Sequence, residues 1–484
     1  MSKELFPVIG LEVHLQLKTE KKMFCNCKNS FENKPNINIC PVCTGQPGAM
    51  PLMNRQALRF AGEMANALNC KINMFMRFDR KNYFYPDCPK NYQITQHDFP
   101  LGYDGEFFFF SEKRQYRIKI QRVQMEEDSA KLNHIGDDLS AGSFIDYNRS
   151  GVPLLEIVTG PDFEDAEAAC AYLEFLKRTA KYLEISDCSM EKGSLRVDTN
   201  ISLTGQKGSL PGYKVEIKNL NSFIAVKNAI EYEMERQRGI INSGNSSSLC
   251  DETRLWDAAN KKTLGMRKKE TESDYRYFPE PDIPPLFIQD KNISELKEST
   301  KLTPFFAMNQ LINTFKIEIG DAYVITAEKQ FYEFFTETSK YTSQYKKIVN
   351  WLTGDVLFNL RKKGIDLSGS KLTPKELGGI IERIESGALT GKIVKELMPE
   401  LIEGASVDKL VEKKGIKPIS SGGELDSLIR GILKKHPEEV KAYRNGKTGL
   451  IGFFMGEVMK GTKGQAEPRR AKEALLKILE NKEE

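Results

Sequence analysis

The chain has 484 residues, of which 40% are hydrophobic and 29% charged. These fractions are ordinary for a soluble globular protein, and they exclude a disordered chain, a collagen-like fibre and a small disulfide scaffold. The length predicts about three domains. We expect a cytoplasmic protein, because no stretch approaches the roughly 18 apolar residues of a membrane span and the first residues lack the layout of a signal peptide.

The net charge of +4 is concentrated at one end of the chain. Residues 401–484 contain 17 Lys or Arg and 13 Asp or Glu, whereas the first 400 residues are balanced. An excess of basic residues favours contact with a polyanion. An excess of this size is also compatible with an ordinary solvated helical surface.

Two close pairs of cysteines lie near the N-terminus, Cys25 with Cys27 and Cys40 with Cys43. Four thiolates at this spacing are typical of a closed tetrahedral Zn²⁺ site. Because no position is left open for a substrate, the pattern predicts a structural zinc that fastens a loop poor in apolar residues. The other cysteines are scattered, and we interpret them as ordinary small residues in a reducing compartment.

Alternating apolar residues predict strands with one polar face in the first half of the chain. Three such strands are expected at residues 11–17, 195–203 and 214–218. Their polar positions are Glu12, His14, Gln16, Arg196, Asp198, Asn200, Lys214, Glu216 and Lys218. A polar face this rich in carboxylates favours a functional site over a merely solvated surface.

A fourth strand, at residues 116–120, continues toward the acidic string Met125-Glu-Glu-Asp128. Its alternation slips between Ile120 and Val123, which predicts a β-bulge. The pattern therefore leaves open whether Glu126 or Glu127 joins the polar face.

Residues 164–183 and 222–238 show the spacing of amphipathic helices, which would cover the apolar side of the strands. The predicted fold class is thus α+β, an antiparallel sheet with helices on one face and a polar face left open. Several carboxylates with one histidine suit Mg²⁺ and phosphoryl transfer. The chain has no Gly-rich phosphate loop and no serine nucleophile motif.

Residues from about 295 onward predict helices almost throughout, after a proline-rich connector at residues 277–286. Thr303-Pro304 and Thr373-Pro-Lys-Glu376 are typical helix starts, the second with a capping-box glutamate. We expect a catalytic domain at residues 1–294 with a zinc-binding loop at 25–43, followed by two small all-α domains, 295–405 and 406–484.

Several long strings then carry a resemblance that covers essentially the whole chain. They are Val8-Ile-Gly-Leu-Glu-Val-His14, Phe78-Asp-Arg-Lys-Asn-Tyr-Phe-Tyr-Pro-Asp87, Met125-Glu-Glu-Asp128, Gly193-Ser-Leu-Arg-Val-Asp-Thr-Asn200, Glu216-Ile-Lys-Asn-Leu-Asn-Ser-Phe223 and Asp274-Tyr-Arg-Tyr-Phe-Pro-Glu-Pro-Asp282. Together they closely resemble the GatB family of glutamyl/aspartyl-tRNA amidotransferases.

The resemblance implies a glutamine-synthetase-like catalytic domain and a YqeY-like helical tail. It implies ATP-dependent phosphorylation of the side-chain carboxylate of Glu on tRNA(Gln) or Asp on tRNA(Asn), followed by amidation with ammonia. The ammonia would come from a partner amidase, GatA, and the small protein GatC would complete a heterotrimer. The cofactors implied are ATP, Mg²⁺ and, for this chain, structural Zn²⁺.

The family's functional positions carry over onto three groups of residues. The catalytic group is Glu12, His14, Glu126, Glu127, Asp198 and Glu216, of which all but Glu126 are the expected Mg²⁺ ligands. The residues expected to contact ATP or an acyl phosphate are Lys81, Arg149, Arg196 and Lys218. The residues expected to bind tRNA phosphates are Lys441, Arg444, Lys447, Lys460, Lys463, Arg469 and Arg470.

Two other functions fit parts of the sequence. A non-catalytic, zinc-containing subunit that binds tRNA would use only the cysteine loop and the basic tail. A metal-dependent nuclease would use the acidic face to cleave tRNA without ATP. The acidic face discriminates between the three, because only the amidotransferase needs it for ATP-dependent amide formation.

Overall fold

The computed structural model describes residues 4–30, 34–134, 142–268, 272–415, 422–462, 466 and 468–480. The chain forms two compact units, Met1–Asn309 and Gln310–Glu484. We describe each unit by itself. The predicted domain limits at residues 294 and 405 stay predictions.

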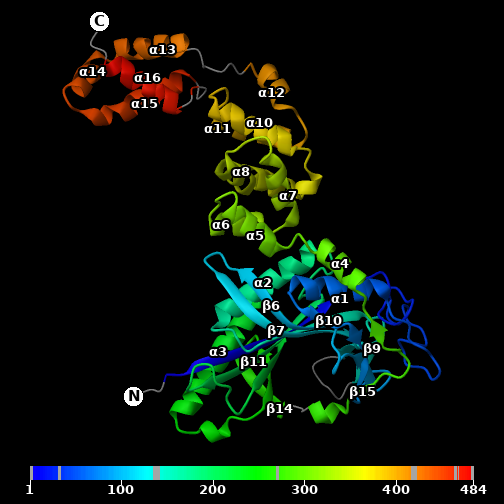
Figure 1. Ribbon diagram of the computed structural model, residues 1–484. Helices are drawn as coiled ribbons and strands as arrows, with labels where there is room; N and C mark the ends of the chain where they lie inside the picture. Colours follow the sequence, from blue (N-terminus) through cyan, green and yellow to red (C-terminus); the bar gives the residue numbers. More distant parts are fainter. Residues whose placement is uncertain are drawn as a thin grey trace. The chain divides into compact units, whose positions relative to one another are not determined.

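The first unit is built on a 9-stranded sheet that is antiparallel except for the β12–β13 pair (Figure 1). In spatial order its strands are β14 (Lys262–Lys268), β13 (Glu252–Asp257), β12 (Val215–Leu220), β11 (Leu195–Thr204), β1 (Phe6–Gln16), β10 (Pro153–Thr159), β7 (Gln115–Glu127), β6 (Gly102–Phe110) and β2 (Lys71–Ile72). The α+β prediction is confirmed, and the strands expected at 11–17, 195–203 and 214–218 fall on β1, β11 and β12.

Three smaller sheets complete the unit. They pair β15 (Phe278–Pro279), β4 (Asp79–Asn82) and β5 (Tyr92–Thr95); β16 (Leu286–Phe287) with β3 (Phe75–Met76); and β8 (Lys131–His134) with β9 (Ser143–Asp146). The β4–β5 hairpin matters for function, because it carries Lys81 and contacts the end of β7.

Helices pack on the apolar side of the main sheet (Figure 1). They are α1 (Arg55–Ala67), α2 (Ala166–Tyr182) and α3 (Phe223–Asn242). Each begins at a residue whose side chain accepts backbone hydrogen bonds from the first turn: Asn54, Asp165 and Ser222. The helices predicted at 164–183 and 222–238 are thus confirmed, and their burial against the sheet leaves the opposite, polar face open.

The β-bulge predicted between Ile120 and Val123 is also confirmed. Val158 on β10 pairs with Arg122, but its neighbour Thr159 pairs with Ile120, so Gln121 is the extra residue. Beyond the bulge the alternation resumes in a new phase, which decides how Glu126 and Glu127 are directed.

The remaining helical segments run from the end of the first unit to the end of the chain. They are α4 (Asp290–Ser299), α5 (Pro304–Asn313), α6 (Ile319–Ile325), α7 (Lys329–Thr338), α8 (Tyr345–Trp351), α9 (Leu357–Lys363), α10 (Pro374–Glu385), α11 (Gly391–Ile402), α12 (Val407–Lys413), α13 (Gly422–Lys435), α14 (Pro437–Arg444), α15 (Ile451–Gly461) and α16 (Pro468–Glu480), with short η2 (Ser246–Ser248), η3 (Glu272–Tyr275), η4 (Leu352–Val356), η5 (Leu367–Gly369) and η6 (Thr448–Leu450). Among the described residues, no helix is long and apolar enough to cross a membrane.

Two predicted helix starts are found where the sequence indicated. Proline opens α5 at Pro304, and α10 follows Thr373, whose hydroxyl accepts a hydrogen bond from the Glu376 N–H. The capping-box role of Glu376 is wrong. Its carboxylate instead accepts a hydrogen bond of 2.7 Å from the Val407 N–H, so it connects two helices.

Candidate active site and metal centres

Strand register gathers the polar residues into two rows across β7, β10, β1 and β11. Paired residues in antiparallel strands share a face, so each row lies side by side on the open side of the sheet. One row is Arg122, Val158, Glu12 and Asp198. The other is Gln124, Glu156, His14 and Arg196.

The second row contains a compact group of potential metal ligands. His14 Nε2 lies 3.6 Å from a Glu126 carboxylate oxygen and 3.9 Å from a Glu156 oxygen. The ligand atoms of these three residues all lie within 4.8 Å of one another, and both carboxylates are buried. One nitrogen and two oxygen donors at this separation fit a divalent cation such as Mg²⁺ or Mn²⁺.

The surroundings of this group hold its carboxylates in place. The Gln124 amide donates to Glu156 at 2.7 Å, and the Thr95 hydroxyl donates to Glu126 at 3.3 Å. Burial and the nearby charge of Glu156 raise the pKa of Glu126. Two buried carboxylates this close repel each other when ionised, so a bound cation would stabilise them both.

A second acidic group surrounds the ammonium of Lys218. Lys218 Nζ lies 2.6 Å from Asp198 and 3.6 Å from Glu216. Glu12 accepts a hydrogen bond of 2.8 Å from the Asn200 amide, and Glu216 accepts one of 2.9 Å from the Thr253 hydroxyl. Although burial opposes a charged lysine, the carboxylates of Asp198 and Glu216 outweigh it and raise the pKa of Lys218.

These residues open onto a cleft of about 400 Å³. It is lined by Glu12, His14, Lys81, His97, Arg122, Gln124, Glu156, Asp198, Lys214, Glu216, Lys218, Asp251, Thr253, Arg267, Tyr275 and Tyr277. Two buried atoms on its wall, Arg122 Nε and Gln124 Oε1, have no hydrogen-bond partner in the described part of the chain. Such atoms favour a polar ligand that would pair with them.

Lys81 adds a positive charge from the β4–β5 hairpin. Its ammonium lies 4.8 Å from the centre of the Tyr275 ring. Burial works against the charge, but the carboxylates of Glu126 and Glu156 outweigh it, so the pKa of Lys81 is raised. The cleft thus combines cationic side chains with carboxylates, as expected where a phosphate and a metal ion bind together.

Glu127 is directed away from both acidic groups. Its carboxylate pairs with Lys90 at 2.5 Å and accepts a hydrogen bond of 3.0 Å from the Ile94 N–H. The alternation of β7 explains this, because consecutive residues of a strand face opposite ways. The structure therefore brings Glu126, and not Glu127, beside His14.

Arg149 and Arg196 lie around the buried Asp128. Arg196 pairs with Asp128 at 2.8 Å, and Arg149 lies 3.7 Å from it while donating to the carbonyls of Ser129 and Ala130. Although burial opposes ionisation, both guanidinium groups lower the pKa of Asp128. Arg149 is not among the residues that line the cleft, so its geometry is that of a support for the loop after β7.

Sequence reasoning missed Glu156, Gln124 and Arg122. Glu156 is the single acid in the otherwise apolar run Pro153-Leu-Leu-Glu-Ile-Val158. A lone carboxylate in a buried strand is unfavourable unless it is paired, and this signal could have identified it. Gln124 and Arg122 flank the bulge of β7, where the shifted alternation hid the face that they share.

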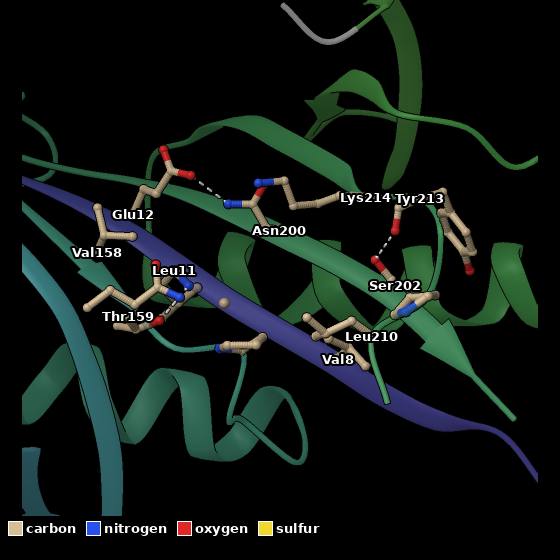
Figure 2. A pocket seen from close by; sticks show the side chains of 14 residues that line it. Val8, Leu11, Glu12, Val158, Thr159, Asn200, Ser202, Leu210, Tyr213 and Lys214 are labelled. Carbon is tan, nitrogen blue, oxygen red and sulfur yellow. Dashed lines mark hydrogen bonds between the residues drawn. The ribbon is translucent and has the colours of Figure 1, made fainter. Parts of the chain in front are cut away.

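A smaller hollow adjoins the cleft along β1 (Figure 2). It is lined by Val8, Gly10, Leu11, Glu12, Gln121, Val158, Thr159, Pro161, Asn200, Ser202, Leu210, Pro211, Tyr213 and Lys214. Figure 2 shows the hydrogen bond from Asn200 to Glu12 at the end nearer the cleft.

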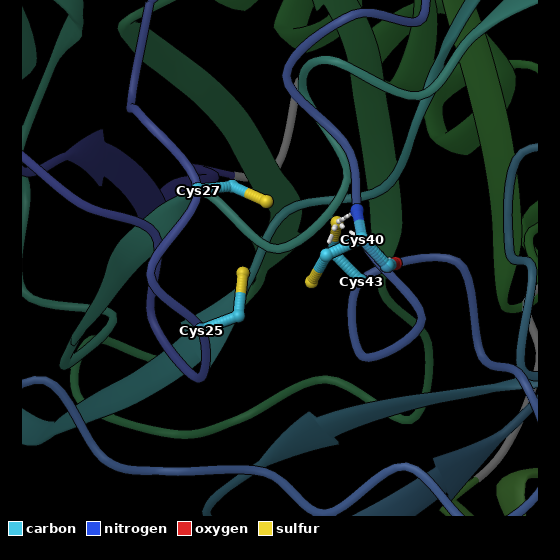
Figure 3. A group of neighbouring side chains, drawn as sticks. All are labelled: Cys25, Cys27, Cys40 and Cys43. Carbon is cyan, nitrogen blue, oxygen red and sulfur yellow. Dashed lines mark hydrogen bonds between the residues drawn. The ribbon is translucent and has the colours of Figure 1, made fainter.

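The four predicted zinc ligands do come together. Cys25 and Cys27 from one loop face Cys40 and Cys43 from another, with all four sulfurs within 4.8 Å of one another (Figure 3). Zn–S bonds of about 2.3 Å place the sulfurs of a tetrahedral site close to this separation. A hydrogen bond from Cys25 and the charge of Lys22 lower the pKa of Cys43 to about 4, as expected for a thiolate ligand.

This cysteine loop is attached to the segment that holds Arg149. The Ser150 hydroxyl donates to the Cys43 carbonyl at 2.8 Å, and Lys22 Nζ donates to the Tyr147 carbonyl at 3.1 Å. The Gly151 N–H in turn donates to the Asp128 carbonyl. The metal centre therefore supports the polar face from behind without lining the cleft.

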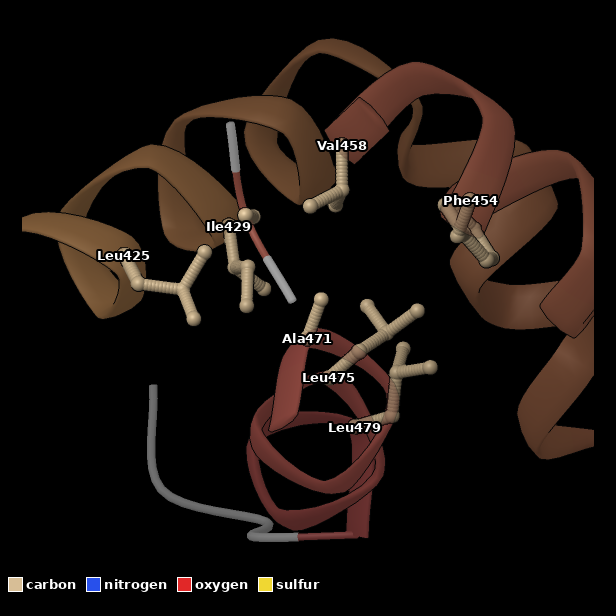
Figure 4. Close-up of a cluster of buried hydrophobic side chains, with 8 residues drawn as sticks. Leu425, Ile429, Phe454, Val458, Ala471, Leu475 and Leu479 are labelled. Carbon is tan, nitrogen blue, oxygen red and sulfur yellow. The ribbon is translucent and has the colours of Figure 1, made fainter. Parts of the chain in front are cut away.

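The basic tail forms a small helical bundle with its own core (Figure 4). Buried residues of α13, α15 and α16 meet there, among them Ile429, Phe454 and Leu475. The predicted tRNA contacts Lys441, Arg444, Lys447, Lys460, Arg469 and Arg470 are all exposed. Lys463 lies outside the described residues.

Comparison with known proteins places this architecture in a family. The GatB/GatE catalytic domain matches residues 7–294, and the GatB domain matches residues 333–479. A relative from Crocosphaera subtropica is 43% identical, over 98% of this chain and 97% of its own length. Relatives from Thermotoga maritima and Persephonella marina are 42% identical over 98% of this chain and at least 99% of theirs. All three are named as the second, GatB-type component of an aspartyl/glutamyl-tRNA(Asn/Gln) amidotransferase.

Proposed function

This chain belongs to the GatB family of tRNA amidotransferase components, and on that basis we propose that it converts a glutamyl or aspartyl ester of tRNA to the amide. ATP would phosphorylate the side-chain carboxylate, giving an acyl phosphate and ADP. Ammonia would then attack the acyl carbon, and phosphate would leave. The activation is needed because a carboxylate has no good leaving group, whereas an acyl phosphate does.

One observation carries this proposal: two groups of buried or half-buried acids meet cationic side chains at one cleft. The first group is His14, Glu126 and Glu156, and the second is Glu12, Asp198 and Glu216 around Lys218. Both donor sets suit Mg²⁺, which would neutralise charge on the transferred phosphoryl group. A non-catalytic subunit would have no use for this arrangement.

The cationic residues of the cleft have distinct roles in this proposal. Arg122, with its unpartnered Nε, would bind an oxygen of the phosphoryl group. Lys81 would face the same group from the β4–β5 hairpin. Lys218 would hold Asp198 and Glu216 in position while the cleft is empty and exchange them for phosphate oxygens when ATP enters.

Partners and metal follow from the same family membership. We propose that the ammonia comes from the amidase GatA and that GatC completes a cytoplasmic heterotrimer. The substrates would be tRNA(Gln) and tRNA(Asn) mischarged with Glu or Asp. A structural Zn²⁺ bound by Cys25, Cys27, Cys40 and Cys43 is supported by the separation of their sulfurs.

The test is amide formation by the reconstituted complex on glutamyl-tRNA with ATP, Mg²⁺ and glutamine or an ammonium salt. We expect Glu156→Gln and Asp198→Asn each to lower the rate by at least about 100-fold with either nitrogen source, because both remove charge at the metal ions. The matched control is Asp257→Asn, a carboxylate at the end of β13 that does not line the cleft and should leave the rate unchanged.

Full amidation by Glu156→Gln and Asp198→Asn would contradict the catalytic role and favour a tRNA-binding subunit. Cleavage of tRNA with Mg²⁺ and without ATP would favour a nuclease instead.

A further inference from the structure

The hollow beside the cleft has the shape and chemistry of a site for a flat ring. Its volume is about 230 Å³, and Val8 and Gly10 share a strand face with Glu12 at its floor. Val158 and Pro161 line one side, whereas Leu210 lies on the loop between β11 and β12. Apolar walls bind the faces of an aromatic ring and leave its edges to polar groups.

Polar groups for the ring edge are present in the same hollow. The Ser202 hydroxyl donates to the Tyr213 carbonyl at 2.8 Å, which leaves its oxygen lone pairs able to accept from an amino group. Leu210 is 73% exposed, although leucine gains most from burial. A ligand that covers Leu210 would account for both features.

The hollow is continuous with the cleft where phosphates are proposed to bind. Glu12 and Lys214 line both spaces. A molecule with a ring in the hollow and a charged chain in the cleft would therefore pass between these two side chains.

We propose that this hollow binds the adenine ring of ATP while the triphosphate lies in the cleft. The inference rests on the proposed function, which supplies ATP as the ligand. The terminal adenosine of tRNA has the same base, but its single phosphate offers no reason to span both spaces, so we assign the hollow to ATP.

The test compares Mg-ATP with inorganic triphosphate plus Mg²⁺, which has the charge but no ring. Using the assembled complex, we expect Leu210→Ala to raise the Kd for Mg-ATP roughly fivefold, because the ring loses apolar contact. The Kd for triphosphate should be unchanged. Ile224→Ala is the matched control, since Ile224 is also 73% exposed but lies on α3.

Each other outcome is decisive. Unchanged ATP affinity in Leu210→Ala would overturn the adenine site and leave the proposed function standing. Equal weakening of ATP and triphosphate would also overturn it, since the effect would not come from the ring. Weaker binding of glutamyl-tRNA alone would place the tRNA adenosine there, and failure of both ATP and triphosphate to bind wild type would overturn the proposed function itself.

A separate observation concerns Lys22, which is fully buried although lysine is normally exposed. Its Nζ lies 3.5 Å from Cys43 Sγ and 3.1 Å from the Tyr147 carbonyl oxygen. A buried ammonium is unfavourable unless an anion is near. Four thiolates around Zn²⁺ carry a net charge of −2, which provides that anion.

We infer that Lys22 is the buried counter-ion of the metal–thiolate centre, positioning Cys43 and lowering the charge of the cluster. This does not depend on the proposed function. Donors next to metal ligands commonly change metal affinity by 10- to 100-fold. Replacing Lys22 by an apolar residue should thus weaken metal binding even where it leaves the fold intact.

Co²⁺ is the probe, because its thiolate complexes absorb visible light. We expect Lys22→Met to bind Co²⁺ at least about 10-fold more weakly and to shift the sulfur-to-cobalt absorption band, with partial recovery in Lys22→Arg. Lys21→Met is the control, since Lys21 is exposed and contacts Asn26. Wild-type Co²⁺ affinity and spectrum in a folded Lys22→Met variant would overturn the assignment.

Discussion

At the scale of single residues, Glu126 and Glu127 are adjacent but have different surroundings. Glu126 lies beside His14 and Glu156, whereas Glu127 forms a buried ion pair with Lys90. The difference arises because consecutive side chains of β7 face opposite ways. Two neighbouring glutamates can therefore be separated by experiment into one with a metal-binding role and one with a supporting role.

Glu126→Gln should weaken Mn²⁺ binding by at least about 10-fold and remove most ATP-dependent amidation, because the variant loses a charged ligand. Its thermal stability should change little or rise, since burial and Glu156 already raise the pKa of Glu126 and so disfavour its charged form. Mn²⁺ titration followed by electron paramagnetic resonance would measure the affinity. Unchanged Mn²⁺ affinity would contradict the metal site.

Glu127→Gln should behave in the opposite way. It leaves Lys90, which is 11% exposed, without its anion, and breaking a buried pair commonly costs about 3–5 kcal/mol. We expect a lower Tm with Mn²⁺ affinity unchanged at temperatures where the variant is folded. Loss of Mn²⁺ binding without loss of stability would show that Glu127 moves to the metal ions in the active complex.

At the scale of elements, the alternation of polar and apolar residues was enough to predict β1, β11 and β12 and the face that carries Glu12, His14 and Asp198. The bulge in β7 could also be predicted, because the phase slip is written in the sequence. What the sequence could not provide was the register between strands. Only register brings Glu156 beside His14, and the pairing of strands far apart in the chain depends on tertiary packing.

The cysteine loop is an element whose stability should depend on metal. Removing Zn²⁺ with a chelator, or replacing Cys27 by Ser, should lower the Tm of the catalytic unit by roughly 5 °C or more, because metal binding is coupled to folding of the loop. Differential scanning calorimetry measures the change. Cys250→Ser provides the control, since Cys250 is an exposed cysteine outside the cluster. A Tm insensitive to both chelator and Cys27→Ser would contradict a structural metal.

The start of α10 allows a local prediction from sequence to be measured. Thr373→Ala removes the hydroxyl that accepts from the Glu376 N–H and should destabilise the helical unit by about 1 kcal/mol. Ser406 also occupies the N-cap position of a helix, α12, but its side chain makes no capping hydrogen bond. Ser406→Ala should therefore have a clearly smaller effect on urea denaturation, and an equal effect would contradict the cap.

At the scale of the whole molecule, catalysis and tRNA binding are assigned to different ends of the chain. The acidic cleft lies in the first unit, whereas the exposed basic residues of α14, α15 and α16 lie on a bundle with its own core. The core around Phe454 and Leu475 means that surface substitutions on this bundle can be made without unfolding it. The two functions should then fail separately.

Charge reversal on α14 is the test of this separation. Replacing Lys441 and Arg444 by Glu should weaken binding of glutamyl-tRNA and make the dependence of log Kd on log salt shallower, because fewer phosphate contacts release fewer counterions. Hydrolysis of glutamine by the complex without tRNA should be unchanged. Replacing Lys291 and Lys297 of α4 by Glu makes an equal change of charge outside the bundle, and it should leave both the affinity and the salt dependence as they are. Equal loss of tRNA affinity in both double variants would reduce the effect of α14 to net charge, and unchanged affinity in the first would remove the tail from the tRNA interface.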